Sequence, residues 1–106
     1  VSGNVANTDA SKALAEKFLD ATLEGRFVIA KKMAEKKAGE VVDRELFRRM
    51  LDHLERILYT QTASKRDDAT ANIFREIFQA KTYLANPGSS PRMLLEHIAM
   101  VLPRSI

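Results

Sequence analysis

The chain has no cysteine and no tryptophan, and it has only four glycines and three prolines. Without cysteine it can form neither a disulfide framework nor a thiolate metal site. It has no apolar run long enough to cross a membrane, and no basic segment followed by an apolar one that would mark a secretion signal. These absences predict a cytoplasmic protein with no membrane partner.

The motifs of nucleotide-binding and catalytic proteins are also absent. The widely spaced glycines form neither the phosphate loop that ends in Lys-Ser/Thr nor the G-x-G-x-x-G turn. His53 and His97 are the only histidines, and Glu96-His97 offers two ligands where a zinc site needs three or four. No serine lies in a G-x-S-x-G context. We therefore expect no catalytic residue, cofactor, metal or small-molecule substrate, and so no enzyme.

The composition indicates one globular domain that covers residues 1–106. Hydrophobic residues make up 45% of the chain and charged residues 29%, a balance typical of folded soluble proteins. A chain of 106 residues is close to the commonest domain size and can bury a single core. Because the first residue is Val1 and not methionine, we expect a processed form or a piece of a longer protein.

The spacing of apolar residues predicts an all-α fold with no strand. Apolar side chains recur every three or four residues in successive segments, which is the period of a helix with one buried face. The predicted helices are Asp9–Glu24, Arg26–Ala38, Asp43–Thr60, Asp67–Ala85 and Arg92–Leu102. Gly25 and Gly39 are predicted to end the first two helices, and Ser90-Pro91 supplies the cap and the first-turn proline of the last. We expect these five helices to form one compact, bundle-like domain.

Each predicted helix has an apolar face that we expect to lie in the core. The face is most regular on the third helix, where charged residues fill the opposite side. The expected core residues are Ala10, Ala13, Leu14, Phe18 and Ala21; Phe27, Ala30 and Ala34; Leu46, Phe47, Met50, Leu51, Leu54, Ile57 and Leu58; Ala69, Ile73, Ile77, Ala80 and Leu84; and Leu94, Leu95, Ile98, Val101 and Leu102.

The last two predicted helices have more apolar surface than one core needs. The residues on or beside these additional faces are Phe74, Phe78, Lys81, Met93, His97 and Met100. Because soluble domains usually bury such patches against other proteins, we predict that these residues form one contiguous partner interface. Two simpler interpretations remain open: the helices are central in the bundle, or Lys81 only lays its stem along apolar surface.

Basic residues suggest a second possible function. The net charge is +3, and the excess lies mostly at Lys31, Lys32, Lys36 and Lys37. Together with Arg44 and Arg48, these residues could bind nucleic acid through its phosphates. No aromatic or glycine-rich element accompanies the lysines, so a solvated helix end is the simpler interpretation.

The runs Ala80-Lys81-Thr82-Tyr83-Leu84-Ala85-Asn86-Pro87 and Pro91-Arg92-Met93-Leu94-Leu95-Glu96-His97-Ile98 connect the last two helices through an Asn-Pro joint. In these runs the chain resembles the C-terminal domain of bacterial clamp-loader subunits of the DNA polymerase III complex, the delta-prime and gamma/tau type. In that family a helix ends in Leu-x-x-Asn, and a short Asn-Pro joint leads to an apolar helix that starts near Pro-Arg-Leu. The joint here is longer by Gly88-Ser89-Ser90. The first half is similar more loosely, with Leu46–Leu58 in the place of the family's leucine-rich helix.

The resemblance implies a role in DNA replication. Full-length subunits of this family carry an AAA+ ATPase module, a helical lid and this helical domain, and the helical domains pack side by side into a collar. The chain would then be the oligomerisation domain of a clamp-loader subunit, with other clamp-loader subunits as partners and no DNA contact of its own. Within the family, delta-prime is mainly structural and gamma/tau hydrolyses ATP. We favour the delta-prime type.

Overall fold

The computed structural model describes residues 2–35, 43–63 and 67–102, with side chains from residue 10 onward. Within these ranges it has five helices and no strand. The helices are α1 (Ser2–Asp20), α2 (Leu23–Ala34), α3 (Arg44–Gln61), α4 (Asp68–Leu84) and α5 (Pro91–Val101). The predicted all-α, bundle-like fold is therefore confirmed.

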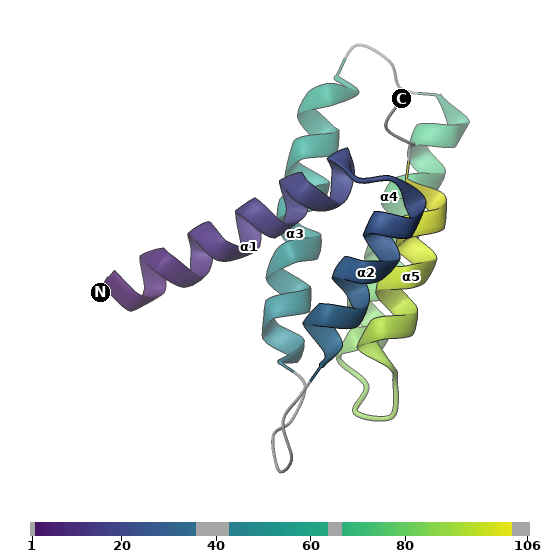
Figure 1. Cartoon of the computed structure of the whole chain (residues 1–106). Helices are drawn as coiled ribbons and strands as arrows, with labels where there is room; N and C mark the ends of the chain where they lie inside the picture. Colours follow the sequence, from purple (N-terminus) through teal and green to yellow (C-terminus); the bar gives the residue numbers. More distant parts are fainter. Residues whose placement is uncertain (1, 36–42, 64–66, 103–106) are drawn as a thin grey trace.

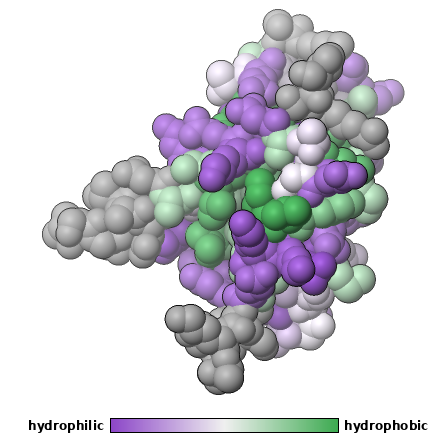
Figure 2. All heavy atoms as spheres, in the orientation of Figure 1, coloured by the Kyte–Doolittle hydropathy of each residue, from purple (hydrophilic) through white to green (hydrophobic). Residues whose placement is uncertain are grey.

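The helices pack around one core (Figure 1). α5 packs against both α2 and α4, α3 lies next to α4, and α1 packs across α3. Every helix contributes to the core, whose buried apolar residues are Ala15, Phe18, Ala30, Phe47, Met50, Leu51, Leu54, Leu58, Ile77, Ala80, Leu84, Leu95, Ile98, Ala99 and Leu102. On the face drawn in Figure 2, apolar side chains form an island in the middle, and hydrophilic side chains surround it. This face therefore combines solvated edges with some exposed apolar surface.

The last three helices begin where the sequence predicts, because each has a strong local cap. Asp43, Asp67 and Ser90 are the N-caps, and each side chain accepts a hydrogen bond from the backbone N–H three residues later, at 3.1, 2.9 and 3.3 Å. Pro91 occupies the first turn of α5, where its missing N–H costs nothing. The predicted and observed ends of these helices agree within about one residue.

The boundaries predicted for the first two helices are wrong. α1 begins at Ser2 and ends at Asp20, and α2 already begins at Leu23. Thr22 is the N-cap of α2, because its hydroxyl accepts a hydrogen bond from the N–H of Gly25 at 3.1 Å. Gly25 therefore lies in the first turn of α2 and does not end α1. α2 ends at Ala34, and the predicted stop at Gly39 lies outside the described residues.

The predicted core face of α1 is confirmed at Phe18, which is buried, and in part at Leu14, which packs against the core, but it is wrong at Ala10 and Ala13. The buried residues of this helix are Ser11, Ala15 and Phe18, whereas Ala10 and Ala13 are exposed. Small side chains at positions 11 and 15 let α1 pack closely on α3, the helix with which it makes most of its contacts. The hydropathy pattern missed this face because serine counts as polar. On α4, similarly, Thr70 is buried and Ala69 is exposed.

Among the side chains that the structure describes, Arg26 is the largest that is fully buried, and the hydropathy pattern gave no sign of it. Its guanidinium donates hydrogen bonds to the carbonyls of Phe18 and Leu19 at the end of α1, at 2.8 and 2.9 Å. It also donates to the carbonyls of Ala99 and Leu102 at the end of α5, at 3.0 and 3.4 Å. The last carbonyls of a helix lack partners within the helix, so one arginine satisfies two helix ends and ties them together.

Arg44 holds the joint between α4 and α5 in a similar way. Its guanidinium donates to the carbonyls of Leu84 and Asn86 at 3.0 and 3.2 Å, and to the carbonyl of Pro87 at 3.0 Å. It also donates to the hydroxyl and the carbonyl of Ser89, at 2.9 and 2.6 Å. The first residue of α3 therefore fixes the path of a joint that lies about forty residues later in the chain.

We predict that Arg44→Gln destabilises the domain by roughly 2 kcal/mol, because several carbonyls at the end of α4 lose a charged donor. Arg48→Gln, one turn further along α3, is the matched control. Its side chain is 49% exposed and binds only surface carboxylates, so we expect a loss of roughly 0.5 kcal/mol. Urea denaturation followed by circular dichroism measures both changes. Equal effects of the two substitutions would show that Arg44 does not hold the joint.

Candidate partner interface

Large apolar side chains are exposed on α4 and α5. Phe78 is 65% exposed, Met93 68% and Met100 57%, and Tyr83 is also more than half exposed. In the described residues outside this pair of helices, only Val28 and Tyr59 are large apolar residues with comparable exposure. Single exposed apolar side chains are common on soluble proteins, but a concentration of them on one pair of helices marks a candidate contact surface.

The other predicted interface residues differ in how exposed they are and in the contacts that they already make. The side chain of His97 is 55% exposed, and its Nε2 lies 2.7 Å from Glu76 Oε2 across the α4–α5 groove. Phe74 is half-buried against the core and meets Tyr59 edge-on, with ring centroids 6.3 Å apart. His97 can contact a partner directly, whereas Phe74 offers only part of its ring.

Lys81 already binds α3. Its Nζ donates to Asp52 Oδ1 at 3.0 Å and to Glu55 Oε1 at 3.2 Å, and its side chain is only 22% exposed. Partial burial acts to lower the pKa of Lys81, but the hydrogen bonds and charges of the two carboxylates outweigh it and raise the pKa above its ordinary value. Lys81 therefore stays protonated and joins α4 to α3, which leaves little of it for a partner.

The predicted interface residues lie on different sides of α4, with Phe74 against Tyr59 of α3 and His97 of α5 against Glu76. The groove between α4 and α5 has a volume of about 240 Å³ and is lined by Glu76, Gln79, Ala80, Tyr83, Leu94 and His97. Phe78 lies about 160° around α4 from Ala80, one of the residues that line this groove. Phe74 meets Tyr59 of α3, and Phe78 follows it by one turn, so the two phenylalanines share one side of α4. The exposed residues therefore make two surfaces.

We name these surfaces by their position. The hairpin surface consists of Tyr83 on α4 and of Met93, His97 and Met100, which share one face of α5. The aromatic surface consists of Tyr59 on α3 and of Phe74 and Phe78 on α4. Tyr59 and Tyr83 were not predicted from the sequence, because neither lies on the apolar stripe of its own helix.

The basic residues suggested for nucleic-acid binding are only partly available. Arg44 is engaged in the α4–α5 joint, and Arg48 binds both Glu45 and Asp52. A hydrogen bond from Arg48 lowers the pKa of Glu45 below its ordinary value, so this pair stays charged at neutral pH. Lys31 and Lys32 are exposed on α2, and Lys36 and Lys37 lie outside the described residues. This set supports a phosphate contact less well than the hairpin surface supports a protein contact.

Neither a metal site nor a membrane-spanning helix is found in the ranges that the structure describes. No group of three or more histidine or carboxylate side chains there could hold a metal ion. None of the helices that the structure describes is long and apolar enough to cross a membrane. Comparisons with protein-family models, with curated proteins and with solved structures found no match. A proposal about function must therefore rest on the residues themselves.

Proposed function

We propose that the chain is an oligomerisation domain that holds a multi-subunit complex together by helix packing, of the collar type found in clamp-loader subunits of DNA replication. The observation that carries the proposal is the exposed hairpin surface on α4 and α5. It lies on the same stretch whose Asn-Pro joint resembles that family. The partners would be other clamp-loader subunits.

The hairpin surface suits such a role because it is built on a fixed scaffold. Arg44 holds the joint between the two helices, and the contact between His97 and Glu76 connects them across the groove. A preformed surface loses little conformational entropy on binding. Met93 and Met100 add unbranched, polarisable side chains that adapt to a neighbouring helix.

The proposed mechanism is apolar burial, with no chemical step in this domain. Stable interfaces between proteins bury about 800 Å² on each partner, with a few large side chains at the centre that contribute most of the affinity. The hairpin surface supplies such side chains. Nucleotide binding and hydrolysis would belong to an ATPase module elsewhere in the full-length subunit.

The test uses Met93→Glu together with Met100→Glu in the full-length subunit, mixed with the purified partner subunits of a clamp loader and analysed by size-exclusion chromatography. We expect the double variant to keep its helical circular dichroism, because both side chains are mostly exposed, and to fail to enter the complex. Val28→Glu on α2, another exposed apolar position, is the control and should leave assembly intact.

A folded double variant that assembles normally would reject the proposal. Salt gives an independent check, because apolar contacts are nearly insensitive to ionic strength whereas phosphate contacts weaken steeply. Assembly that is lost on raising salt would favour the nucleic-acid alternative through Lys31 and Lys32.

A further inference from the structure

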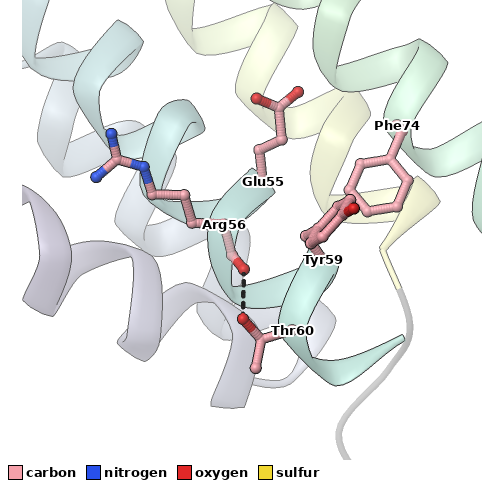
Figure 3. A pocket seen from close by; sticks show the side chains of 5 residues that line it. All are labelled: Glu55, Arg56, Tyr59, Thr60 and Phe74. Atoms are coloured by element: carbon pink, nitrogen blue, oxygen red, sulfur yellow. Dashed lines mark hydrogen bonds between the residues drawn. The ribbon is translucent and has the colours of Figure 1, made fainter. Parts of the chain in front are cut away.

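The aromatic surface borders a pocket between α3 and α4 that the proposed function does not use. The pocket has a volume of about 690 Å³ and is lined by Glu55, Arg56, Tyr59, Thr60 and Phe74 (Figure 3). Tyr59 and Phe74 meet inside it with their rings inclined at 64°. Phe78 lies one turn further along α4 and is 65% exposed. Together they form an apolar strip along the line where the two helices meet.

The charges beside this strip are not balanced. The nearby carboxylates of Asp52 and Glu55 are both bound by Lys81, and Asp52 is also paired with Arg48, so two cations face these two carboxylates. Arg56 and Arg75, in contrast, have no ion pair with any described residue. The free charge around the aromatic surface is therefore positive.

The two arginines flank the strip on opposite sides. Arg56 lies about 60° around α3 from Tyr59, on the side away from α4. Figure 3 shows its side chain extending to the side of α3 opposite Phe74. Arg75 lies about 60° around α4 from Phe78, on the side away from α3. A body lying along the strip would therefore meet aromatic rings in the middle and one guanidinium on each side.

We propose that this groove binds an amphipathic helix of a partner protein, whose apolar stripe packs on Tyr59, Phe74 and Phe78 and whose flanks carry Asp or Glu. The pocket is larger than any single side chain, so successive residues of one helical stripe fill it, as in other helix-in-groove complexes. Carboxylates on the two flanks neutralise Arg56 and Arg75. The groove is separate from the hairpin surface, so this is a second contact of the domain.

A second copy of the chain fits this surface poorly. A symmetric dimer places the same patch on both subunits, so it would set arginine opposite arginine across the interface. Like charges facing one another across an interface suppress association. The charge pattern therefore selects an acidic partner over self-association.

The test uses two designed, hydrocarbon-stapled helical peptides with the same phenylalanine and leucine stripe, one flanked by glutamates and the other by lysines. Fluorescence anisotropy measures their binding to the 106-residue chain. We expect the glutamate peptide to bind about ten-fold more tightly. Arg56→Glu with Arg75→Glu should reverse this preference. Lys31→Glu with Lys32→Glu makes the same change in net charge on α2 and should preserve it.

A second pair of variants tests the apolar contacts of the groove. Tyr59→Ser with Phe78→Ser, both exposed positions, should weaken the glutamate peptide about ten-fold, whereas Met93→Glu with Met100→Glu should not. The proposal fails if neither peptide binds, if both bind equally, or if the α2 charge reversal acts as strongly as the groove reversal. None of these results depends on whether the domain belongs to a clamp loader.

Discussion

Arg26→Met is expected to cost the domain about 3–5 kcal/mol of stability, because it leaves buried carbonyls without their charged donor. Methionine retains most of the length of the side chain, so the loss reports the hydrogen bonds more than a cavity. Arg26 is 0% exposed, so water cannot replace the lost donor without opening the core. Small domains are stable by only about 5–15 kcal/mol in total. Thermal denaturation followed by circular dichroism should show a melting temperature lower by on the order of 10–20 °C.

Arg26→Lys distinguishes the contribution of the positive charge from that of the hydrogen-bond geometry of the guanidinium. Lysine keeps the positive charge but has a single nitrogen, whereas the guanidinium of Arg26 reaches the ends of both α1 and α5 with three. We expect lysine to recover less than half of the loss. Arg75→Met, on the exposed face of α4, should change stability by no more than about 0.5 kcal/mol. If Arg26→Met melts close to the wild type, the arginine does not join the two helix ends.

The second half of the fold could be predicted from the sequence because its signals are local. Asp43, Asp67 and Ser90 each cap a helix within three residues of their own position, and Pro91 can occupy only the first turn. Leu54 and its neighbours on α3 form a regular apolar stripe that the structure buries. Where a residue and the helix end that it fixes lie within one turn of each other, a single sequence is enough to predict that end.

The first half of the fold was harder to predict, because the residues that bury its side chains lie far away in the sequence. Arg26 is buried by carbonyls that include that of Ala99, 73 residues away. Ser11 is buried on a helix that packs against α3, and a hydropathy pattern does not reveal that packing. At the α1–α2 boundary two local signals compete. Gly25 could end α1, and Thr22 could cap the start of α2. The structure has the second arrangement, because the hydroxyl of Thr22 accepts a hydrogen bond from the N–H of Gly25.

The sequence predicted which residues of the candidate interface are exposed better than it predicted how they are arranged on the surface. Phe78, Met93 and Met100 were recognised because their helices already had complete core faces, and the structure exposes all three. Their division into two surfaces depends on how α3 and α5 each pack on α4, which is tertiary information. The same packing brings Tyr59 from α3 onto Phe74, a contact between residues that no single-helix pattern relates.

Leu54→Ala is expected to cost about 2–5 kcal/mol, the usual range for truncating a buried leucine. Leu54 is 0% exposed and lies in the middle of α3, the helix that packs against α1, α4 and α5. Because three helices surround the site and hold one another in place, the cavity can collapse only in part. The cost should therefore fall in the upper half of that range.

The measurement is urea denaturation of Leu54→Ala beside Lys32→Ala, an exposed position on α2 that should change stability by no more than about 0.5 kcal/mol. The slope against urea should stay the same for both variants, because neither changes the surface that unfolding exposes. The midpoint should fall only for Leu54→Ala. A similar midpoint for the two variants would mean that α3 does not pack with Leu54 at the centre of the bundle, and the core described above would then be wrong at its best-defined position.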